Sequence, residues 1–271
     1  MGRSLTRHVY DVRDTPPGIH RALPSPWLTF VVPVDEPLRM RRPDGGCADF
    51  RACLAGLHDE PGTIVHPGRQ AGIHVTVDPL AARALFGVPA AALAGHSVEA
   101  ADVVGRIGRE LCERVDAGAT WGVRLAALDD VLARLLRAHD DGSRTADEVR
   151  HAWGRITAGG SVRDVAREVG WSTDHLSRRF AAEFGVRPSV AGRMARFDRA
   201  RHEIVRRAGR GALDLAGVAA DHGYADQAHL AREFRALAGC SATTWVTEEV
   251  RSGLVGSVQD DTGADPRSSA A

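Results

Sequence analysis

A short segment that carries Arg occurs twice in this sequence. Leu176-x-Arg178-x-Phe180 returns 54 residues later as Leu230-x-Arg232-x-Phe234. Leu and Phe four residues apart share one face of a helix, so each pair is expected to face a core. Asp174, Ser177 and Arg178 are then turned outward. A guanidinium is a planar fork of N–H donors that can bind a phosphate or a base edge bidentately, so this placement suits contact with nucleic acid.

The surrounding residues repeat as well, and they predict a helix-turn-helix in each unit. Val165-Ala166 returns as Val218-Ala219, Gly170-Trp171 as Gly223-Tyr224, and Gly185 as Gly239. Each unit is therefore a short helix, a turn centred on Gly, a second helix and a closing Gly. The second helix of such a unit can lie in the major groove of DNA. Residues suited to capping helix N-termini occur at the expected boundaries, namely Ser161, Ser172, Asp214 and Asp226.

One helix is predicted between the two units, from Pro188 to about Ala208. Proline suits the first turn of a helix. One apolar face follows, formed by Val190, Met194, Phe197 and Ile204. About twenty helical residues span ~30 Å, close to the ~34 Å turn of B-DNA, so two recognition helices could enter successive major grooves on one side of the duplex.

The charge distribution agrees with this placement. The chain has 35 basic and 35 acidic residues, and every basic residue is Arg. The zero net charge excludes a generally basic surface. The halves differ, however: residues 1–149 carry a net −3, residues 150–250 a net +4 and residues 251–271 a net −1. Residues 161–210 hold 12 Arg against 6 acids, which favours a nucleic-acid face in this part of the chain.

With these motifs, residues 146–248 resemble the AraC/XylS family of transcription regulators. The motifs that carry the resemblance are Gly170-Trp171-Ser172, Leu176-Ser177-Arg178-Arg179-Phe180, Gly223-Tyr224-Ala225-Asp226-Gln227 and Leu230-Ala231-Arg232-Glu233-Phe234. The resemblance implies a seven-helix DNA-binding domain with two recognition helices. One residue departs from the family pattern, because Ala242 stands where Pro usually follows Ser241. This change is expected to leave the fold intact and to loosen the start of the last helix.

The resemblance also implies which residues contact DNA. Base-contacting positions map onto Asp174, Ser177 and Arg178 in the first unit, and onto Gln227, Ala228, Ala231 and Arg232 in the second. Arg can bind guanine, Gln can read adenine, and an Ala methyl can meet thymine, whereas Asp174 would need to accept from cytosine. The remaining candidates are expected near phosphates or at the helix start: Ser172, His175, Arg179 and His229.

The N-terminal part is expected to be β-rich, which makes the fold class α+β. Short β-rich runs at residues 9–12, 27–34, 63–65 and 73–77 alternate with Pro- and Gly-containing turns. A short helix near Gly87, an i, i+4 row from Val103 to Val115 and a longer amphipathic helix over 121–139 follow. This last helix could pack on its own domain or form a dimer surface. The expected domains are a sensor or dimerisation domain at 1–140, a DNA-binding domain at 146–250 and a disordered tail at 251–271.

A looser resemblance connects this N-terminal part to uncharacterised sensor-type domains that precede such DNA-binding units. It rests on four segments: Pro43-Asp44-Gly45-Gly46-Cys47-Ala48-Asp49-Phe50, Gly56-Leu57-His58, Gly72-Ile73-His74-Val75 and the residues 79–89. The resemblance implies an architecture and no ligand. Trp27, Phe30 and Phe50 could enclose a small pocket, although such aromatic residues are more often part of a core.

The sequence offers less support for a metal site or an enzyme. His58, His66 and His74, with Cys47 and Cys53, lack the close ligand spacing of metal sites, so no metal and no cofactor are expected. No GxSxG, Walker or HExxH motif appears, so no catalytic residue is expected. The four Cys, which include Cys112 and Cys240, lie in no reactive motif. The alternative function is a small-molecule or metal-binding sensor whose helical domain is a protein-interaction module.

The expected partner is double-stranded DNA of a promoter or operator. RNA polymerase, a small-molecule effector and a second copy of the chain are further candidate partners. No apolar run is long enough to span a membrane, and the N-terminus lacks a secretory pattern. A cytoplasmic location with reduced Cys is therefore expected.

Overall fold

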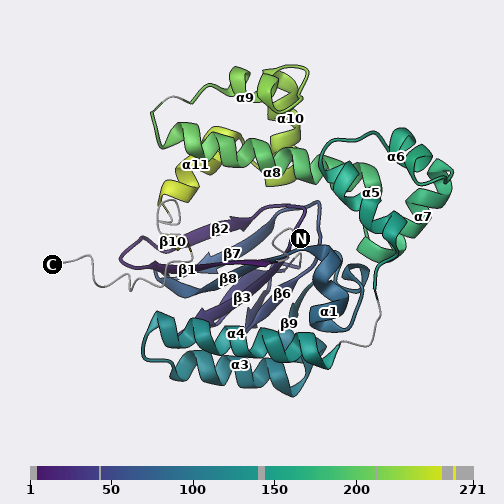
Figure 1. The fold of residues 1–271 in the computed structure, drawn as a ribbon. Coiled ribbons are helices and arrows are strands. Elements are labelled where there is room, and N and C mark those ends of the chain that lie inside the picture. Colours follow the sequence, from purple (N-terminus) through teal and green to yellow (C-terminus); the bar gives the residue numbers. More distant parts are fainter. Residues whose placement is uncertain (1–4, 43, 140–143, 212, 252–258, 261–271) are drawn as a thin grey trace.

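The computed structural model describes residues 5–42, 44–139, 144–211, 213–251 and 259–260 (Figure 1). Two antiparallel β-sheets come first along the chain, and helices cover them and continue to the C-terminal part. The α+β class expected from the sequence is confirmed. Seven helices, α5 to α11, lie beyond residue 146 in the described part of the chain, as the resemblance implied.

The larger sheet has six strands in the order β10-β1-β8-β3-β6-β9. Their bounds are β1 Leu5–Val12, β3 Leu28–Val34, β6 Cys53–Ala55, β8 Gln70–Val77, β9 Ser97–Glu99 and β10 Gln259–Asp260. β3 pairs with β8 on one side and β6 on the other, and six of its seven residues are buried. A strand that is covered on both faces needs apolar residues at successive positions, which explains the unbroken apolar run there.

The smaller sheet has four strands in the order β2-β7-β4-β5. Their bounds are β2 Gly18–Ala22, β4 Leu38–Arg41, β5 Cys47–Phe50 and β7 Gly62–His66. A small core joins the two sheets: Tyr10, Val31 and Cys53 of the larger sheet pack with Leu38 of the smaller one. The sheets therefore lie face to face.

Helices cover the other face of the larger sheet (Figure 1). They are α1 (Ala82–Phe86), α2 (Ala100–Val104), α3 (Arg106–Ala117) and α4 (Trp121–Ala138), with short 3₁₀ turns η1 (Pro79–Ala81) and η2 (Ala90–Ala92). α1 ends at Gly87 with φ +71°, as its position in the sequence predicted. The i, i+4 row from Val103 to Val115 is broken at Gly105, whose φ of +62° separates α2 from α3.

The amphipathic helix expected over 121–139 is confirmed as α4. Its apolar face, with Leu128, Val131 and Leu135, is buried in the protein's own core, and it packs along α3. This contact accounts for the apolar stripe without a second copy of the chain. Val123 and Leu136 lie outside it and are 54% and 46% exposed.

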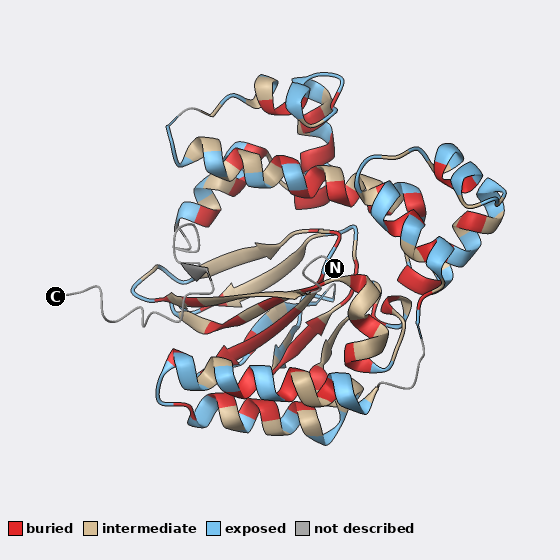
Figure 2. Ribbon diagram, in the orientation of Figure 1, coloured by how far each residue is buried: buried red, intermediate tan, exposed pale blue. Residues whose placement is uncertain are grey.

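The helical part contains two cores that share α8 (Pro188–Ala208). The first core continues from the sheets into α5 (Asp147–Thr157), α6 (Val162–Glu168), α7 (Thr173–Phe184) and the start of α8. The second is formed by the end of α8 with α9 (Leu215–Asp221), α10 (Gln227–Ala238) and α11 (Ala242–Arg251). Figure 2 shows the buried faces of these helices turned toward one another. α8 therefore connects two separate hydrophobic clusters.

Within the segment expected to be a disordered tail, Gln259–Asp260 forms β10, which pairs antiparallel with β1 through His8 and Val9. The remaining tail beyond Arg251 lies outside the described residues.

The aromatic residues that could enclose a pocket differ in burial: Phe30 is buried at 2% exposure, whereas Trp27 is 36% exposed. No helix among the described residues is long and apolar enough to cross a membrane.

Candidate nucleic-acid interface

The first repeat folds as a helix-turn-helix of α6 and α7. Ser161 and Ser172 cap the two helices, each accepting a hydrogen bond from a backbone N–H three residues later. Gly170 between them has φ +71°, a left-handed conformation that favours Gly. The Trp171 N–H returns to the Ala166 carbonyl at 2.8 Å and closes the turn.

The second repeat folds in the same way from α9 and α10. Asp214 caps α9 and Asp226 caps α10, where it accepts a 2.6 Å hydrogen bond from the His229 N–H. Gly223 has φ +73°, and the Tyr224 N–H donates to the Ala219 carbonyl at 3.0 Å. The 53-residue offset seen in the sequence thus relates two turns of the same geometry.

Both second helices bury the Leu–Phe pairs and expose the opposite edge. Leu176, Phe180, Leu230 and Phe234 are each at most 1% exposed. None of the eleven residues expected to contact DNA is buried. Those classed as exposed are Ser172, Asp174, Arg178, Arg179, Gln227, Ala228 and Arg232, and those half-buried are His175, Ser177, His229 and Ala231.

A His sits against an aromatic ring at the start of each second helix. His175 meets Trp171 edge-on at 4.7 Å, and His229 meets Tyr224 edge-on at 5.3 Å between ring centroids. The Ala225 N–H donates to Nδ1 of His229 at 3.3 Å. With Nδ1 as the acceptor, the neutral ring carries its proton on Nε2, which leaves a donor for an anionic partner.

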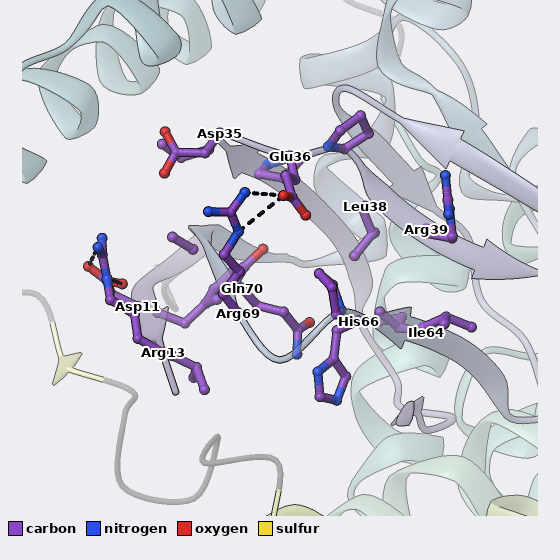
Figure 3. Close-up of a pocket in the computed structure, with 18 of the residues that line it drawn as sticks. Asp11, Arg13, Asp35, Glu36, Leu38, Arg39, Ile64, His66, Arg69 and Gln70 are labelled. Atoms are coloured by element: carbon purple, nitrogen blue, oxygen red, sulfur yellow. Dashed lines mark hydrogen bonds and ion pairs between the residues drawn. The ribbon is translucent and has the colours of Figure 1, made fainter. Parts of the chain in front are cut away.

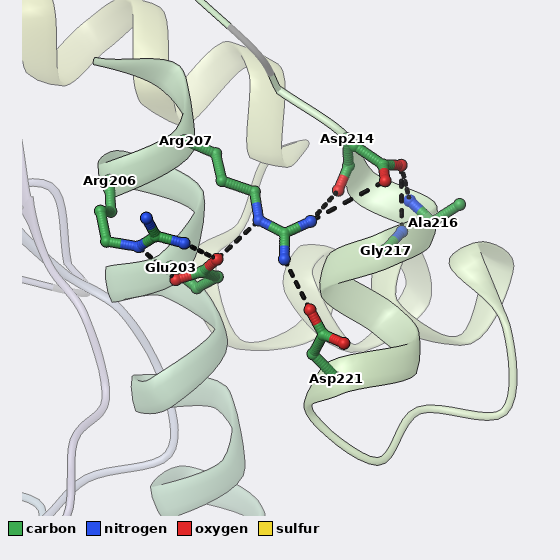
Figure 4. A network of polar contacts seen from close by, with 7 residues as sticks. All are labelled: Glu203, Arg206, Arg207, Asp214, Ala216, Gly217 and Asp221. Atoms are coloured by element: carbon green, nitrogen blue, oxygen red, sulfur yellow. Dashed lines mark hydrogen bonds and ion pairs between the residues drawn. The ribbon is translucent and has the colours of Figure 1, made fainter. Parts of the chain in front are cut away.

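The end of α8 is tied to α9 by Arg207 (Figure 4). Its Nε donates to Glu203 at 2.6 Å and its Nη2 to Asp221 at 2.6 Å, while its Nη1 contacts Asp214. Hydrogen bonds from Arg206 and Arg207 lower the pKa of Glu203 to about 2. The network therefore orients the first helix of the second unit relative to α8.

A buried carboxylate ties α10 to the middle of α8. Glu233 is 8% exposed and accepts hydrogen bonds from Arg196 of α8 at 2.8 Å and from the Tyr224 hydroxyl at 3.0 Å. The Arg196 guanidinium also lies over the Tyr224 ring at 4.8 Å. These residues could not be predicted from the sequence, since a lone Glu within an amphipathic helix shows no sign of a partner 37 residues away.

The N-terminal part contacts both units. Arg83 of α1 donates two hydrogen bonds of 2.9 Å to Glu183 near the end of α7, and the Thr145 hydroxyl donates a third. Arg21 of β2 donates to Glu248 of α11 at 2.6 Å and to the Ala238 carbonyl at 3.2 Å. The end of α7 is therefore linked to α1, and the end of α10 is linked to the smaller sheet.

Residues 165–248 match a protein family described as a helix-turn-helix domain. The matched segment contains both α7 and α10. It is a helix-turn-helix domain of the AraC type. No sequence among curated proteins matches this chain.

The fold around the AraC-type domain is also found in solved structures. ToxT from Vibrio cholerae matches with a TM-score of 0.51 at 10% identity, over 90% of this chain and 98% of that one. An apo point variant of ToxT from V. cholerae strain SCE256 matches with a TM-score of 0.51 at 9% identity, over 91% and 98%. The C-terminal domain of AraT, a response regulator from Geobacillus stearothermophilus, is 21% identical over 39% and 88%, with a TM-score of 0.35. At such low identity the likeness to ToxT concerns the fold: two sheets, then helices.

The other residues considered for chemistry lie apart from the AraC-type domain or in unreactive settings. Among the described residues, no group of three or more His, Cys, Asp or Glu is arranged to hold a metal ion. Burial raises the pKa of Cys53 to about 12 and that of Cys112 to about 11, so both thiols stay protonated at neutral pH. A protonated thiol is a poor nucleophile.

Proposed function

We propose that this chain is a sequence-specific transcription regulator that reads duplex DNA with α7 and α10. The observation that carries the proposal is the structural repeat, in which each second helix buries its Leu–Phe pair and exposes Arg178 or Arg232 on the opposite edge. Both helices are attached to α8, whose 21 residues span ~30 Å, about one turn of B-DNA.

The residues divide by chemistry into base-reading and backbone-contacting groups. Arg178 and Arg232 would bind guanine bidentately, Gln227 would bind adenine, and the methyls of Ala228 and Ala231 would contact thymine. Ser177 and Asp174 complete the exposed edge of α7. Asp174 also lies in the first turn of α7, where a negative charge interacts favourably with the helix dipole and stabilises the helix. The residues proposed to contact phosphate or support the helix start are Ser172, His175, Arg179 and His229.

Fluorescence anisotropy with a labelled duplex from upstream of the protein's own gene tests the proposal. Arg178→Ala and Arg232→Ala should each reduce discrimination against a scrambled duplex by roughly 1–3 kcal/mol, or about 5- to 150-fold. Arg109→Ala is the matched control, because it removes one exposed Arg from α3. Unchanged discrimination in both variants would contradict the base-reading roles.

Salt dependence separates this function from the alternative of a protein-interaction module. Binding through phosphate contacts weakens steeply as salt rises, because bound counterions are released. An absence of DNA binding even at low salt would favour the interaction module.

We also propose that residues 1–140 form a sensor domain that acts on the DNA-binding domain at 146–250. The support is the pair of contacts Arg83–Glu183 and Arg21–Glu248, which reach α7 of the first unit and α11, which packs on α10 of the second. A signal that moves the sheets would change the relative placement of α7 and α10. RNA polymerase and a second copy of the chain are proposed as further partners.

A further inference from the structure

A cavity of about 250 Å³ opens at one end of the two sheets. It is formed where β1, β3 and β7 end and where β4 and β8 begin. Its apolar wall includes Val34, Leu38 and Ile64. The volume lies just below the ~300–1,000 Å³ of drug-sized sites, so it suits a metabolite-sized molecule.

Two residues that line this cavity each have a buried polar atom with no hydrogen-bond partner among the described residues. The two atoms are Nδ1 of His66 and Nε2 of Gln70, both shielded from solvent. The His66 residue is 4% exposed. Figure 3 shows both side chains among the lining residues, with the Arg69–Glu36 pair nearby. A buried polar group without a partner costs about 1–3 kcal/mol, so such groups usually have a partner that the protein alone does not supply.

The opening of the cavity has more carboxylates than guanidiniums. Arg13 is bonded to Asp11 at 2.7 Å, and Arg69 is paired with Glu36. Asp14 and Asp35 also line the cavity and have no ion-pair partner among the residues that the structure describes. The hydrogen bond that Arg13 donates to Asp11 raises the pKa of Arg13 most, and the nearby charges of Asp35 and Asp14 add to it. The nearby Arg39 is already bonded to Asp49 at 2.8 Å.

We propose that this cavity binds a small organic cation that carries hydroxyl groups, such as an amino alcohol or an amino sugar. A hydroxyl oxygen would accept from Gln70 inside the cavity and exchange a hydrogen bond with His66. The ammonium group would lie at the opening, near Asp35 and Asp14. An anion is disfavoured because each lining Arg already has a carboxylate partner.

The neutral state of the His66 ring is consistent with a cationic ligand. Burial, and then the neighbouring His20, lower the pKa of His66, so the ring is neutral at physiological pH and adds no positive charge. A neutral imidazole can donate or accept a hydrogen bond with a hydroxyl.

The same cavity offers a physical connection to the DNA-binding part, and this step rests on the proposed regulatory function. His20 lies close enough to His66 to influence its pKa, and its Nδ1 is 3.0 Å from Oε1 of Glu249 in α11. That oxygen accepts a 3.0 Å hydrogen bond from Trp245, a core residue of the second unit. A ligand bonded to His66 would therefore be connected, through His20 and Glu249, to the packing of α10 and α11.

Ligand-observed NMR and calorimetry on the full chain test the ligand class with three probes of similar size. They are glucosamine, glucose and gluconate, measured at a pH where the amine is protonated. Glucosamine should bind about tenfold more tightly than glucose, and gluconate should bind most weakly. Equal affinities, tightest binding of gluconate, or no detectable binding of any probe would overturn the proposal.

Two variants locate the binding. Gln70→Leu should weaken glucosamine binding at least tenfold while the Tm of the unliganded protein stays unchanged or rises, because an unpartnered buried donor is removed. A purely structural Gln70 would lower the Tm instead. Asp35→Asn should bring the affinity for glucosamine to that for glucose, since Asn tolerates the φ of +71° at this position. Glu113→Gln, on the exposed face of α3, is the matched charge control and should change nothing.

DNA binding by the same preparations separates the two proposals. A protein that binds DNA but none of the probes would disprove the cation site and leave the regulator intact. A protein that binds glucosamine but no DNA at low salt would do the reverse.

Discussion

The guanidinium of Arg83 in α1 and the carboxylate of Glu183 in α7 are joined by two hydrogen bonds of 2.9 Å. Glu183 is only 8% exposed and also accepts from the Thr145 hydroxyl. Close by, a Cβ on Gly185 would lie 2.2 Å from Cβ of Ala94. The C-terminal end of α7 is therefore packed against the N-terminal part, while its exposed edge stays accessible.

Arg83→Ala should lower the free energy of unfolding by roughly 1–3 kcal/mol, because it removes both charged hydrogen bonds from a buried carboxylate. Adding Glu183→Gln should recover part of this loss, since the uncompensated charge is gone. Urea unfolding measures both effects, with Arg109→Ala expected within about 0.5 kcal/mol of the parent. Strictly additive losses in the double variant would show that the pair does not interact.

Gly170→Ala should destabilise the protein by about 1–2 kcal/mol through its backbone alone. Its φ is +71°, and a Cβ there would meet nothing within 4 Å. Gly154→Ala is the matched control: the site is equally open but lies within the helix α5, so Ala should stabilise by about 0.5–1 kcal/mol. Thermal unfolding of the two variants should shift in opposite directions, and a shared direction would contradict this account.

Glu203→Gln should reduce the acid sensitivity of the protein. The hydrogen bonds from Arg206 and Arg207 lower the pKa of Glu203 to about 2, against about 4.3 in an unfolded chain. The folded state thus prefers the charged carboxylate, and the resulting stability is present above about pH 4.3 and is lost as the pH falls toward 2. Urea midpoints over this pH range should depend less on pH in the variant, whereas Glu113→Gln should follow the parent.

Tyr224→Phe should cost about 1 kcal/mol, since it removes the 3.0 Å hydrogen bond to Glu233 and keeps the ring under Arg196. Glu233→Ala should cost more, because it leaves the Arg196 charge without its carboxylate partner. If Glu233 orients α10, Glu233→Ala should also weaken DNA binding in the anisotropy assay below the unfolding transition. Normal DNA binding by a folded Glu233→Ala protein would contradict that role.

The strands with apolar runs could be predicted from the sequence, whereas β2, β4 and β5 of the smaller sheet could not. The run at 27–34 is apolar at nearly every position because β3 lies inside the larger sheet. β2, β4 and β5 belong to the smaller sheet and include charged or polar residues such as His20, Arg39 and Asp49. Their apolar pattern is weak because Leu38 is the one buried residue among these three strands, so their pairing depends on neighbours that are distant in sequence.

The sequence by itself determined the two helix-turn-helix units, since caps, left-handed Gly turns and Leu–Phe pairs act within a few residues and need no distant partner. It therefore also determined which edge of α7 and α10 is exposed. Only the tertiary structure decided how these helices are held, through Glu183 with Arg83 and Glu233 with Arg196, and where His66 and Gln70 meet in one cavity. Such contacts join residues that are far apart along the chain, and their separation follows no helical or strand period. No local sequence pattern can therefore predict them.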